Sequence, residues 1–507
     1  MSALSSVSAA DAVRMPRLPP VGRPGPGNRR KCSLAAGSVC SIIASNAGAN
    51  GPLAAPRLTL DLEGLMFETT GSQMLDRRRM LKLMAGTAAG GALLNVAPGV
   101  VDGALAAAPP IPSVTARLSM VSYTNHTWPI IAVRNKFFDD VGIKVAPADG
   151  RIVFENQSVP LLQNGEVDIS TIFVGVLTPA LDKIKNIRPF LVHSYWQGNT
   201  ILTGPKSGFK TLDDFMAEGK TFTEAAKLTV EQMKGKKLTV PPTISTRPWL
   251  EFIYGFAGMK LEDSDLVILE DPNAVQLAVS GGVPFAAPAG AVQIYQLQFQ
   301  AGWKPLISTR QLVKYAGGPN GAPVQKILNY DGFAATTDFI KANKDTIHRF
   351  NSVMYRTMAG IFGPNQMTEL EKQVPFVNAA NGSNLDAAAI KFIFAELDPF
   401  FPWEAQPRLW TDKADPLFYK NVYEYQVQKF IDDKAIAPGP YDLDELFPAR
   451  AIYLEAAAMK AKAAELAAKA DAANLSGEKK ALAEAGKSFA AKYDFLDAVR
   501  FLEASLG

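Results

Sequence analysis

From Arg117 onward the chain alternates short β-type runs with helical runs, and this alternation constrains the fold more than any other feature. The run Arg117–Tyr123 predicts a strand, and the following Pro129–Val141 has its apolar residues at helical spacing. The alternation continues to Trp196, with a predicted helix at Leu177–Lys185, and starts again at Lys237. Strands that alternate with helices are typical of a mainly parallel sheet covered by helices. The sequence therefore predicts an α/β fold built from two similar units.

Two α/β units in succession predict two lobes with a cleft between them. Clefts outside the carboxyl ends of strands are the usual ligand sites of such folds. We place the two chain crossovers between the lobes near Trp196–Leu202 and Ser308–Asp331. From Ala449 the chain is rich in Ala, Lys and Glu, and Asn474–Gly477 breaks this stretch into two predicted helices. The expected domains are 107–200 and 309–450 for one lobe, 201–308 for the other, and 451–507 for a helical hairpin extension.

Composition argues against several classes of function. Of the 507 residues, 48% are hydrophobic, so the chain can bury a large core. A net charge of +3 is too small to indicate binding to nucleic acid or to an acidic membrane surface. Three histidines and two cysteines offer little from which to build a metal site, so we expect neither a metal nor another cofactor.

Residues 74–106 have the organisation of an export signal. A basic start that includes Arg77 and Arg78 precedes a mild apolar run, and Ala104–Ala106 resembles an A-x-A cleavage site. The basic part resembles the twin-arginine consensus, which implies export of a folded protein. A membrane anchor or a disordered linker is the alternative. Residues 1–73 are rich in Pro, Gly, Ser and Ala, and we expect them to be disordered or to precede a true start at Met74.

Five sequence blocks occur in an order that is typical of one family. They are IIAVRNKFFDDVGIKV (130–145), LLQNGEVDIS (161–170), TLDDF with MKGKKLTVP (211–215 and 233–241), AVQLAVSGGV (274–283) and FAATTDFIKANKDTIHRFNSVMYRTM (333–358). Together they resemble the substrate-binding proteins of ABC importers for nitrate, sulfonates and taurine. The resemblance implies a two-lobed periplasmic-binding-protein type II fold that closes on a small molecule by a hinge. It also implies a periplasmic protein, monomeric, whose partner is an ABC permease in the cytoplasmic membrane.

The chain departs from the family's pattern at three places. Pro284 stands where the second V-D block of the family has an acidic residue, which leaves the polarity of the cleft open. Residues 216–232 separate two motifs that adjoin in the family, and the chain beyond Arg450 is longer than the family needs. The last two departures indicate appended helices rather than a different chemistry.

Polar side chains precede a proline-initiated helix at two predicted strand ends, Ser122–Pro129 and Thr243–Trp249. Proline near the first helical position, with Ser or Thr before it, is typical of a helix start, and the free N–H groups there bind anions. Arg247 adds a planar fork that matches a carboxylate or a sulfonate. We therefore predict that the ligand is a small organic anion, a sulfonate or a carboxylate, and this class includes aromatic anions. The alternative is that these residues are ordinary caps and that Arg247 is solvated.

Aromatic residues gather near the same strand ends and would suit a planar or apolar ligand body, although each is also suited to core packing. Asp168, in the V-D block, is expected to organise the fold rather than to contact ligand. The predicted ligand-binding residues are Tyr123, Asn125, His126, Trp128, Phe173, Trp196, Thr243, Ser245, Thr246, Arg247, Trp249 and Tyr330.

Two other functions stay open. One is an enzyme, because the same fold family includes synthases of the thiamine pyrimidine that use a histidine and a cysteine-rich stretch. Cys32 and Cys40 both precede the export signal, and no G-x-S-x-G or H-E-x-x-H motif occurs, so we expect no enzymatic activity. The other is a binding protein that reports ligand to a membrane kinase without transporting it. Permease and ATPase genes beside its own gene would favour transport.

The export signal gives a first testable prediction. Replacing Arg77 and Arg78 by Lys should trap the protein inside the cell, because twin-arginine export requires the arginine pair. Cell fractionation measures this, and N-terminal sequencing of the exported parent should find a start close to Ala107. Exported material that carries residues before Met74 would contradict the prediction.

Overall fold

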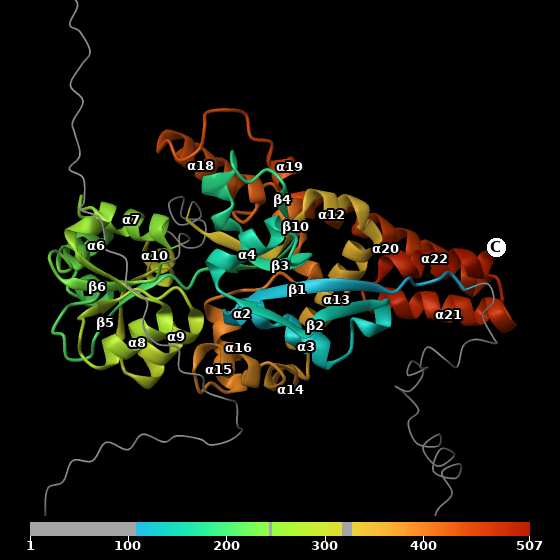
Figure 1. The fold of residues 1–507 in the computed structure, drawn as a ribbon, viewed down its shortest axis with the longest axis horizontal. Coiled ribbons are helices and arrows are strands. Elements are labelled where there is room, and N and C mark those ends of the chain that lie inside the picture. The colour runs from blue at the N-terminus through green and yellow to red at the C-terminus, as the bar shows by residue number, and fades with distance from the viewer. Residues whose placement is uncertain (1–107, 243–245, 317–326) are drawn as a thin grey trace, which may run out of the picture. The chain divides into compact units, whose positions relative to one another are not determined.

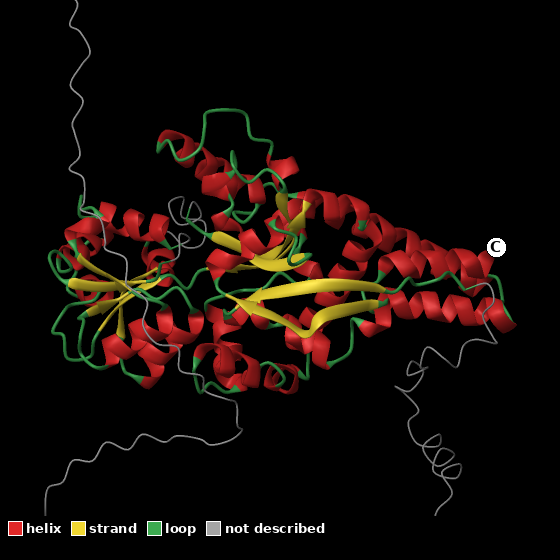
Figure 2. Cartoon of the chain, in the orientation of Figure 1, coloured by secondary structure: helices red, strands yellow, loops and turns green. Residues whose placement is uncertain are grey.

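The computed structural model describes residues 108–242, 246–316 and 327–507 of this protein. They form two five-stranded sheets flanked by helices, together with a group of helices at the C-terminus (Figure 1, Figure 2). Within these ranges no helix combines the length and the apolar composition that crossing a membrane requires.

The first sheet, which with its helices is called lobe 1, has the strand order β2-β1-β3-β10-β4. β1 pairs in parallel with β2 and β3, whereas β10 is antiparallel to β3 and β4. Just before β3, the carboxylate of Asp168 accepts the backbone N–H (2.8 Å) and Nε–H (3.0 Å) of Arg117 on β1, so its predicted role in organising the fold is confirmed. The strands are β1 Val114–Val121, β2 Ile143–Val153, β3 Ile169–Phe173, β4 Ile187–Trp196 and β10 Asn329–Thr336.

The second sheet, in lobe 2, has the order β7-β6-β8-β5-β9. β6 is parallel to β7 and β8, whereas β5 is antiparallel to β8 and β9. The two lobes thus repeat one plan, a parallel set with one reversed strand. The strands are β5 Thr200–Thr203, β6 Lys237–Val240, β7 Asp265–Ile268, β8 Phe285–Ala286 and β9 Lys304–Ser308.

The reversed strand in each lobe is the one that follows a crossover. β4 runs toward the carboxyl edge of sheet 1, and the chain then enters lobe 2 as β5. β9 runs toward the carboxyl edge of sheet 2, and the chain returns to lobe 1 as β10. Because each crossover enters the new sheet at its carboxyl edge, the entering strand must run against its parallel neighbours. The carboxyl ends of the parallel strands in both lobes therefore lie at the crossovers, where folds of this kind place a ligand.

Helices cover both sheets. The predicted insertion 216–232 contains the whole of α6 (Phe222–Glu231), and Thr221 caps this helix by accepting the N–H of Glu224. Ala225, Ala226 and Val230 of α6 enter the core of lobe 2, so the insertion is a structural helix. The other helices of lobe 2 are α5 Leu212–Ala217, α7 Arg247–Gly255, α8 Asp271–Val279, α9 Ala291–Tyr295 and α10 Thr309–Tyr315.

The core of lobe 1 is centred on α13 (Lys344–Ile361), whose apolar residues recur at helical spacing. Phe350 on α13 packs edge-on against Phe333 of β10, at 5.1 Å between ring centroids, and against Phe190 of β4, at 5.7 Å. The other helices of lobe 1 are α2 Thr124–Thr127, α3 Pro129–Arg134, α4 Glu155–Gln163, α12 Thr337–Ala342, α14 Gln366–Glu371, α15 Val374–Asn381, α16 Ala387–Glu396, α17 Pro407–Trp410, α18 Tyr419–Asp432 and α19 Leu443–Leu446.

Three helical predictions need correction. The predicted helix Pro129–Val141 ends at Arg134, because Lys136 adopts the left-handed conformation with φ of 58°. The predicted helix Leu177–Lys185 contains only a 3₁₀ turn, Thr178–Ala180, which begins beside a proline. The C-terminal extension is not a two-helix hairpin, because a second break at Lys492–Asp494 divides its last part.

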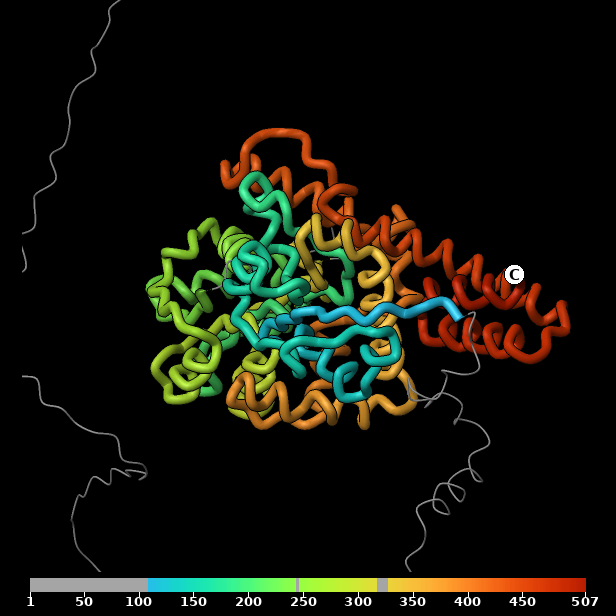
Figure 3. The backbone as a smooth tube through the Cα atoms, turned by 45° about the vertical axis from the view of Figure 1, so that its right-hand side comes forward, coloured from blue at the N-terminus to red at the C-terminus, as the bar shows by residue number. Residues whose placement is uncertain are grey.

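The extension consists of α20 (Pro448–Ala472), α21 (Gly477–Ala491) and α22 (Phe495–Leu506). Tyr493 has φ of 64°, and the carboxylate of Asp494 accepts the N–H of Asp497, so the chain stops α21 and caps a new helix. The Ala-rich composition gave no signal for this break. The described chain begins beside α22, where Arg500 donates to the carbonyl oxygen of Pro110 at 3.2 Å (Figure 3).

A buried ion pair ties α22 to the core of lobe 1. Arg349 on α13 is 1% exposed and donates to both carboxylate oxygens of Asp497, which is fully buried, at 2.7 and 2.8 Å. This geometry is the bidentate fork that compensates best for burying two charges. The extension is therefore part of the folded lobe.

Removing one member of this pair should destabilise the protein strongly. Asp497→Ala leaves the Arg349 guanidinium buried without its carboxylate, so the free energy of unfolding should fall by about 3–5 kcal/mol. Denaturant unfolding measures this. Glu503 lies on the same helix as Asp497 and forms an exposed ion pair with Lys462 of α20. As a control, Glu503→Ala should change the free energy of unfolding by less than about 0.5 kcal/mol. Equal effects of the two substitutions would contradict the proposed contribution of the buried pair.

Candidate functional site

Two adjoining cavities lie between the lobes, at the carboxyl edges of both sheets. Both cavities are partly open to solvent, and the outer one is the larger. Tyr123 and Glu155 line both. The outer cavity is also lined by Ser122, Phe154, Asn156, Pro241, Pro242, Glu270, Asp271, Pro272, Gln293, Ala380 and Asn381, and the inner one by Asn125, Phe173, Trp196, Thr246, Ala289 and Ala291.

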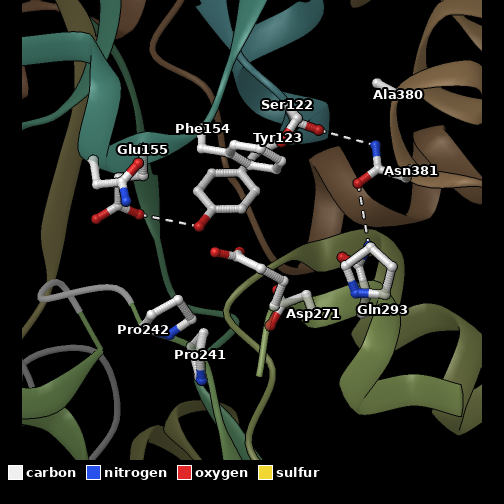
Figure 4. Close-up of a pocket in the computed structure, with 13 residues that line it drawn as sticks. Ser122, Tyr123, Phe154, Glu155, Pro241, Pro242, Asp271, Gln293, Ala380 and Asn381 are labelled. Carbon is white, nitrogen blue, oxygen red and sulfur yellow. Dashed lines mark hydrogen bonds between the residues drawn. The ribbon is translucent and has the colours of Figure 1, made fainter. Parts of the chain in front are cut away.

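Lobe 1 contributes a tyrosine and a glutamate from neighbouring strand ends. Tyr123 follows β1 and Glu155 follows β2, and these two strands pair in parallel. The Tyr123 hydroxyl donates to Oε2 of Glu155 at 3.1 Å, as Figure 4 shows. The parallel pairing is what brings together two side chains that the sequence separates by a whole strand and helix.

Lobe 2 contributes a buried carboxylate. Asp271 is the first residue of α8 and is 7% exposed. Its oxygens accept the backbone N–H groups of Ala289 (3.2 Å) and Gly290 (2.5 Å), in the turn between β8 and α9. A side chain at Gly290 would not fit, because a Cβ there would lie 2.2 Å from Oε1 of Gln293 and 3.0 Å from Oδ2 of Asp271. The glycine therefore allows the close approach of the carboxylate.

The cavities carry negative charge. Glu155, Glu270 and Asp271 line them, and none of the described lining residues is Lys, Arg or His. Burial raises the pKa of Asp271 to about 6, although the hydrogen bonds from the two backbone N–H groups act in the opposite direction. The pKa of Tyr123 is raised well above its ordinary value by burial and, beyond that, by the charges of Glu155, Asp271 and Glu270. The tyrosine hydroxyl therefore lies within the field of all three carboxylates.

A chain of hydrogen bonds crosses from lobe 2 to lobe 1 beside the cavity. Gln293 of α9 donates to Oδ1 of Asn381 at 3.1 Å, and Asn381 of α15 donates to the carbonyl oxygen of Ser122 at 2.9 Å (Figure 4). Gln293 is 1% exposed, so this contact is shielded from water. It links the end of β1 to the helix that follows β8.

The inner cavity joins the first crossover. Trp196 is the last residue of β4, and its indole N–H donates to Oδ1 of Asn199 at 2.7 Å. The ring covers Gly198, where a Cβ would lie 2.4 Å from a ring carbon. Asn199 also accepts, through its carbonyl oxygen, the N–H of Thr309 after β9 at 2.9 Å. One wall of the cavity is therefore attached to both crossover segments.

A buried polar network positions Asn125 in the inner cavity. Its Nδ2 donates to Oδ1 of Asp398 at 2.9 Å, and its carbonyl oxygen accepts Nε2–H of His193 at 2.8 Å. His126 pairs with Asp331 at 2.8 Å in the same region. Burial lowers the pKa of His126 to about 3 and raises the pKa values of Asp331 and Asp398 well above the usual range. The network is therefore held neutral, as burial without water requires.

The structure brings five of the predicted residues together around the inner cavity, namely Tyr123, Asn125, Phe173, Trp196 and Thr246. His126, Trp128 and Tyr330 are instead completely buried in lobe 1, where His126 pairs with Asp331 and Tyr330 donates to the carbonyl oxygen of Leu417. All four residues of the short helix α2 are buried, and Tyr330 lies within β10, so proximity to a strand end did not bring His126, Trp128 and Tyr330 to the cavity. Thr243 and Ser245 lie outside the described residues.

Arg247 and Trp249 lie away from these two cavities, and Trp249 lines another cavity together with Phe252 and with Gly175 of lobe 1. Neither lines the outer or the inner cavity. The Arg247 guanidinium donates to Glu251 (2.8 Å) on its own helix and to Glu262 (2.6 Å), so two carboxylates already occupy its fork. Trp249 is 3% exposed and packs in the core of lobe 2. The predicted anion site at this helix start is therefore not formed by Arg247.

Sequence reasoning missed the acidic residues and the amide pair. Glu155, Asp271, Gln293 and Asn381 all line the outer cavity. A signal for one of them was present, because Asp271-Pro272 follows a predicted strand and opens a helix in the same way as Arg247-Pro248. The rule that selected Arg247, a charged residue directly before a proline at a helix start, would also have selected Asp271.

No protein-family model matches this chain, and no curated protein does. Solved structures are similar to it. The aliphatic sulphonate-binding protein SsuA from Escherichia coli aligns with 67% of this chain and 92% of its own, at 14% identity and a TM-score of 0.44. The alkanesulfonate-binding protein SsuA from Xanthomonas axonopodis pv. citri, bound to MOPS, aligns over 58% and 86%, at 15% identity and 0.41. The nitrate-binding protein NrtA from Synechocystis PCC 6803 aligns over 67% and 92%, at 14% and 0.39.

These three are binding proteins of the kind that the sequence motifs resemble. The desulfurization enzyme DSZB aligns as well, over 67% of this chain and 98% of its own, at 12% identity and a TM-score of 0.41. At such identities and TM-scores the likeness assigns no ligand and no residue role to this chain. The topology described above is that of a two-lobed periplasmic-binding-protein fold with a C-terminal helical region, as the sequence predicted.

The buried carboxyl of Asp271 predicts a pH-dependent stability. Its pKa rises from 3.8 to about 6 on folding, so its protonation stabilises the folded protein fully below pH 3.8, and this contribution is lost as the pH rises through about 6. Asp271→Asn removes the group. The unfolding free energy of the variant relative to the parent should therefore rise by about 3 kcal/mol between about pH 3 and pH 7.5.

Denaturant unfolding across this pH range measures the effect. Asp265→Asn, which changes an exposed carboxylate on β7 of the same lobe, is the control and should give a much flatter difference. A flat difference for Asp271→Asn as well would contradict the burial of a charged group at this position.

Proposed function

We propose that the protein is an exported solute-binding protein of an ABC importer, and that it captures a small organic molecule in the interlobe cavities. The observation that carries the proposal is a pair of cavities lined from both lobes at the carboxyl edges of both sheets. In the part of the chain that the structure describes, the strands pass from one sheet to the other twice, after β4 and after β9. A molecule held in these cavities contacts both lobes at once, so its binding favours the closed arrangement.

The walls of the cavities suit an organic solute. Tyr123, Phe173 and Trp196 offer ring surface in the inner cavity, and Asn125 offers an amide fixed by Asp398. A small number of fixed polar groups among apolar walls is the usual composition of a small-molecule site. The indole N–H of Trp196 donates to Asn199 in the first crossover, so a ligand packed against the indole ring contacts a residue that is bonded to the hinge.

The remaining parts of the proposal concern the setting of the protein. It would leave the cytoplasm by the twin-arginine route, act in the periplasm as a monomer, and deliver its ligand to a permease in the cytoplasmic membrane. A sensor that passes the bound state to a kinase would use the same cavity. An enzyme is less favoured, because no histidine or cysteine is among the described residues of the cavity walls.

Closure can be tested on the mature chain from Ala107. Solutes are first screened by thermal shift, and X-ray scattering then compares the radius of gyration with and without each solute that stabilises the protein. We expect the radius of gyration to fall at saturation, because both lobes contact the ligand. Failure of every stabilising solute to change the scattering profile would argue against hinge closure.

A glycine pair provides the matched variants. Gly198→Ala forces the Trp196 ring away from the crossover and should weaken solute binding about tenfold, which is ~1.4 kcal/mol. Gly255→Ala, where a Cβ meets nothing within 4 Å, should leave binding unchanged. Equal affinities for the two variants would show that Trp196 and the crossover do not take part in binding.

A further inference from the structure

The ionisable side chains that line the interlobe cavities have one sign of charge. Glu155 comes from lobe 1, and Glu270 and Asp271 come from lobe 2. Arg247, which the sequence suggested as an anion ligand, pairs with Glu251 and Glu262 and lines neither cavity. The field of the site is therefore negative on both of its faces.

An anionic ligand would find its usual donors already occupied. The turn between β8 and α9 presents the backbone N–H groups of Ala289 and Gly290, and such groups at a helix start are typical anion ligands. In this protein both of them donate to the carboxylate of Asp271. The chain thus supplies its own anion at the place where a bound carboxylate or sulfonate would be held.

We propose that the cavity binds an organic cation, an ammonium or amidinium group carried on an aromatic or apolar body. This inference rests on the proposed function, because it takes the interlobe cavities to be the solute site. The cationic group would lie between Glu155 and Asp271 in the outer cavity, and the body of the molecule would lie beside it against Tyr123 and Phe154.

The energetics of burial favour such a ligand. Asp271 is 7% exposed, and no described Lys, Arg or His forms an ion pair with it, so its charge is compensated by two backbone N–H groups and by the N-terminus of its own helix, α8. An uncompensated buried charge is costly, and a cation placed against it recovers both Coulomb attraction and a charge-assisted hydrogen bond. A carboxylate can accept more than two hydrogen bonds, so the existing N–H contacts leave lone pairs for a ligand.

Two aromatic rings line the outer cavity beside the carboxylates, where they add to the attraction of a cation. Phe154 lines the outer cavity and is 54% exposed. Tyr123 lies between the outer and the inner cavity, and Figure 4 shows its hydroxyl directed toward Glu155. The faces of such rings attract cations, and this adds to the attraction of the carboxylates.

The same charges account for selective closure. Without ligand, carboxylates of lobe 1 and lobe 2 face one cavity, and their repulsion opposes the approach of the lobes. A cation between them turns that repulsion into two attractions, whereas an anion adds to it. The contacts that select a cation are therefore the same contacts that hold the two lobes together.

Three probes of nearly the same shape and different charge test the inference on the mature protein: benzamidinium, benzamide and benzoate. Titration calorimetry at pH 7.5 and constant ionic strength should give benzamidinium an affinity at least tenfold above that of benzoate, with benzamide between them. Asp271→Asn should weaken benzamidinium binding about tenfold and leave benzamide little changed, because only the charged probe uses the carboxylate. Arg247→Ala is the control and should keep the order of the three probes.

Two results would overturn the inference. If benzoate binds more tightly than benzamidinium, the site is an anion site, and the proposed solute-binding function stands with a different ligand. If none of the three probes binds, an aromatic cation is not the ligand class, and the scattering test of closure decides the proposed function separately. An Asp271→Asn protein that unfolds is replaced by Glu155→Gln, for which the same selective loss of benzamidinium is expected.

Discussion

The direction of two strands determines where everything else in the protein can be. β5 and β10 each enter a sheet from a crossover, and each runs against its parallel neighbours. Both crossovers therefore lie at the carboxyl edges, and the loops that follow the parallel strands of both lobes meet there. Tyr123, Glu155 and Asp271 are brought to one cavity for this reason alone. A fold in which the chain entered lobe 2 from the other edge would leave these side chains on separate surfaces.

Burial decides which polar groups of this region are structural and which remain for a ligand. Deep in lobe 1, His126 bonds to Asp331 and Asn125 bonds to Asp398, and burial keeps both the imidazole and the carboxyls uncharged, although Oδ2 of each aspartate has no hydrogen-bond partner among the described residues. At the cavity, Asp271 is nearly as buried, but its partners are two backbone N–H groups rather than a side chain of opposite charge. The first group of residues holds lobe 1 together. Asp271 keeps part of its capacity for hydrogen bonds and charge pairing, and this is the property expected of a binding residue.

The sequence predicted residues that line the cavity more accurately than it predicted which charged residues are present there. Residues chosen because they follow predicted strands, such as Phe173 and Trp196, do line the inner cavity, since strand order and strand direction follow from the alternation pattern. Arg247 was chosen by the same rule and is not there. At the first position of α7 its long side chain turns along the helix to Glu251 and across to Glu262. The direction of a side chain around a helix start depends on such neighbours, and no local pattern reports them.

The sequence by itself determined the two α/β units, the position of the crossovers, the helical extension and the aromatic residues at the strand ends. Periodicity, proline and glycine act over a few residues, and a reader of the sequence can follow them. The tertiary structure alone decided the electrostatic character of the site. Glu155 and Asp271 are far apart in the chain and come from different lobes, and the N–H groups that hold Asp271 come from a third segment at Ala289 and Gly290. Charges act through space, so their sum at a cavity exists only after the chain has folded.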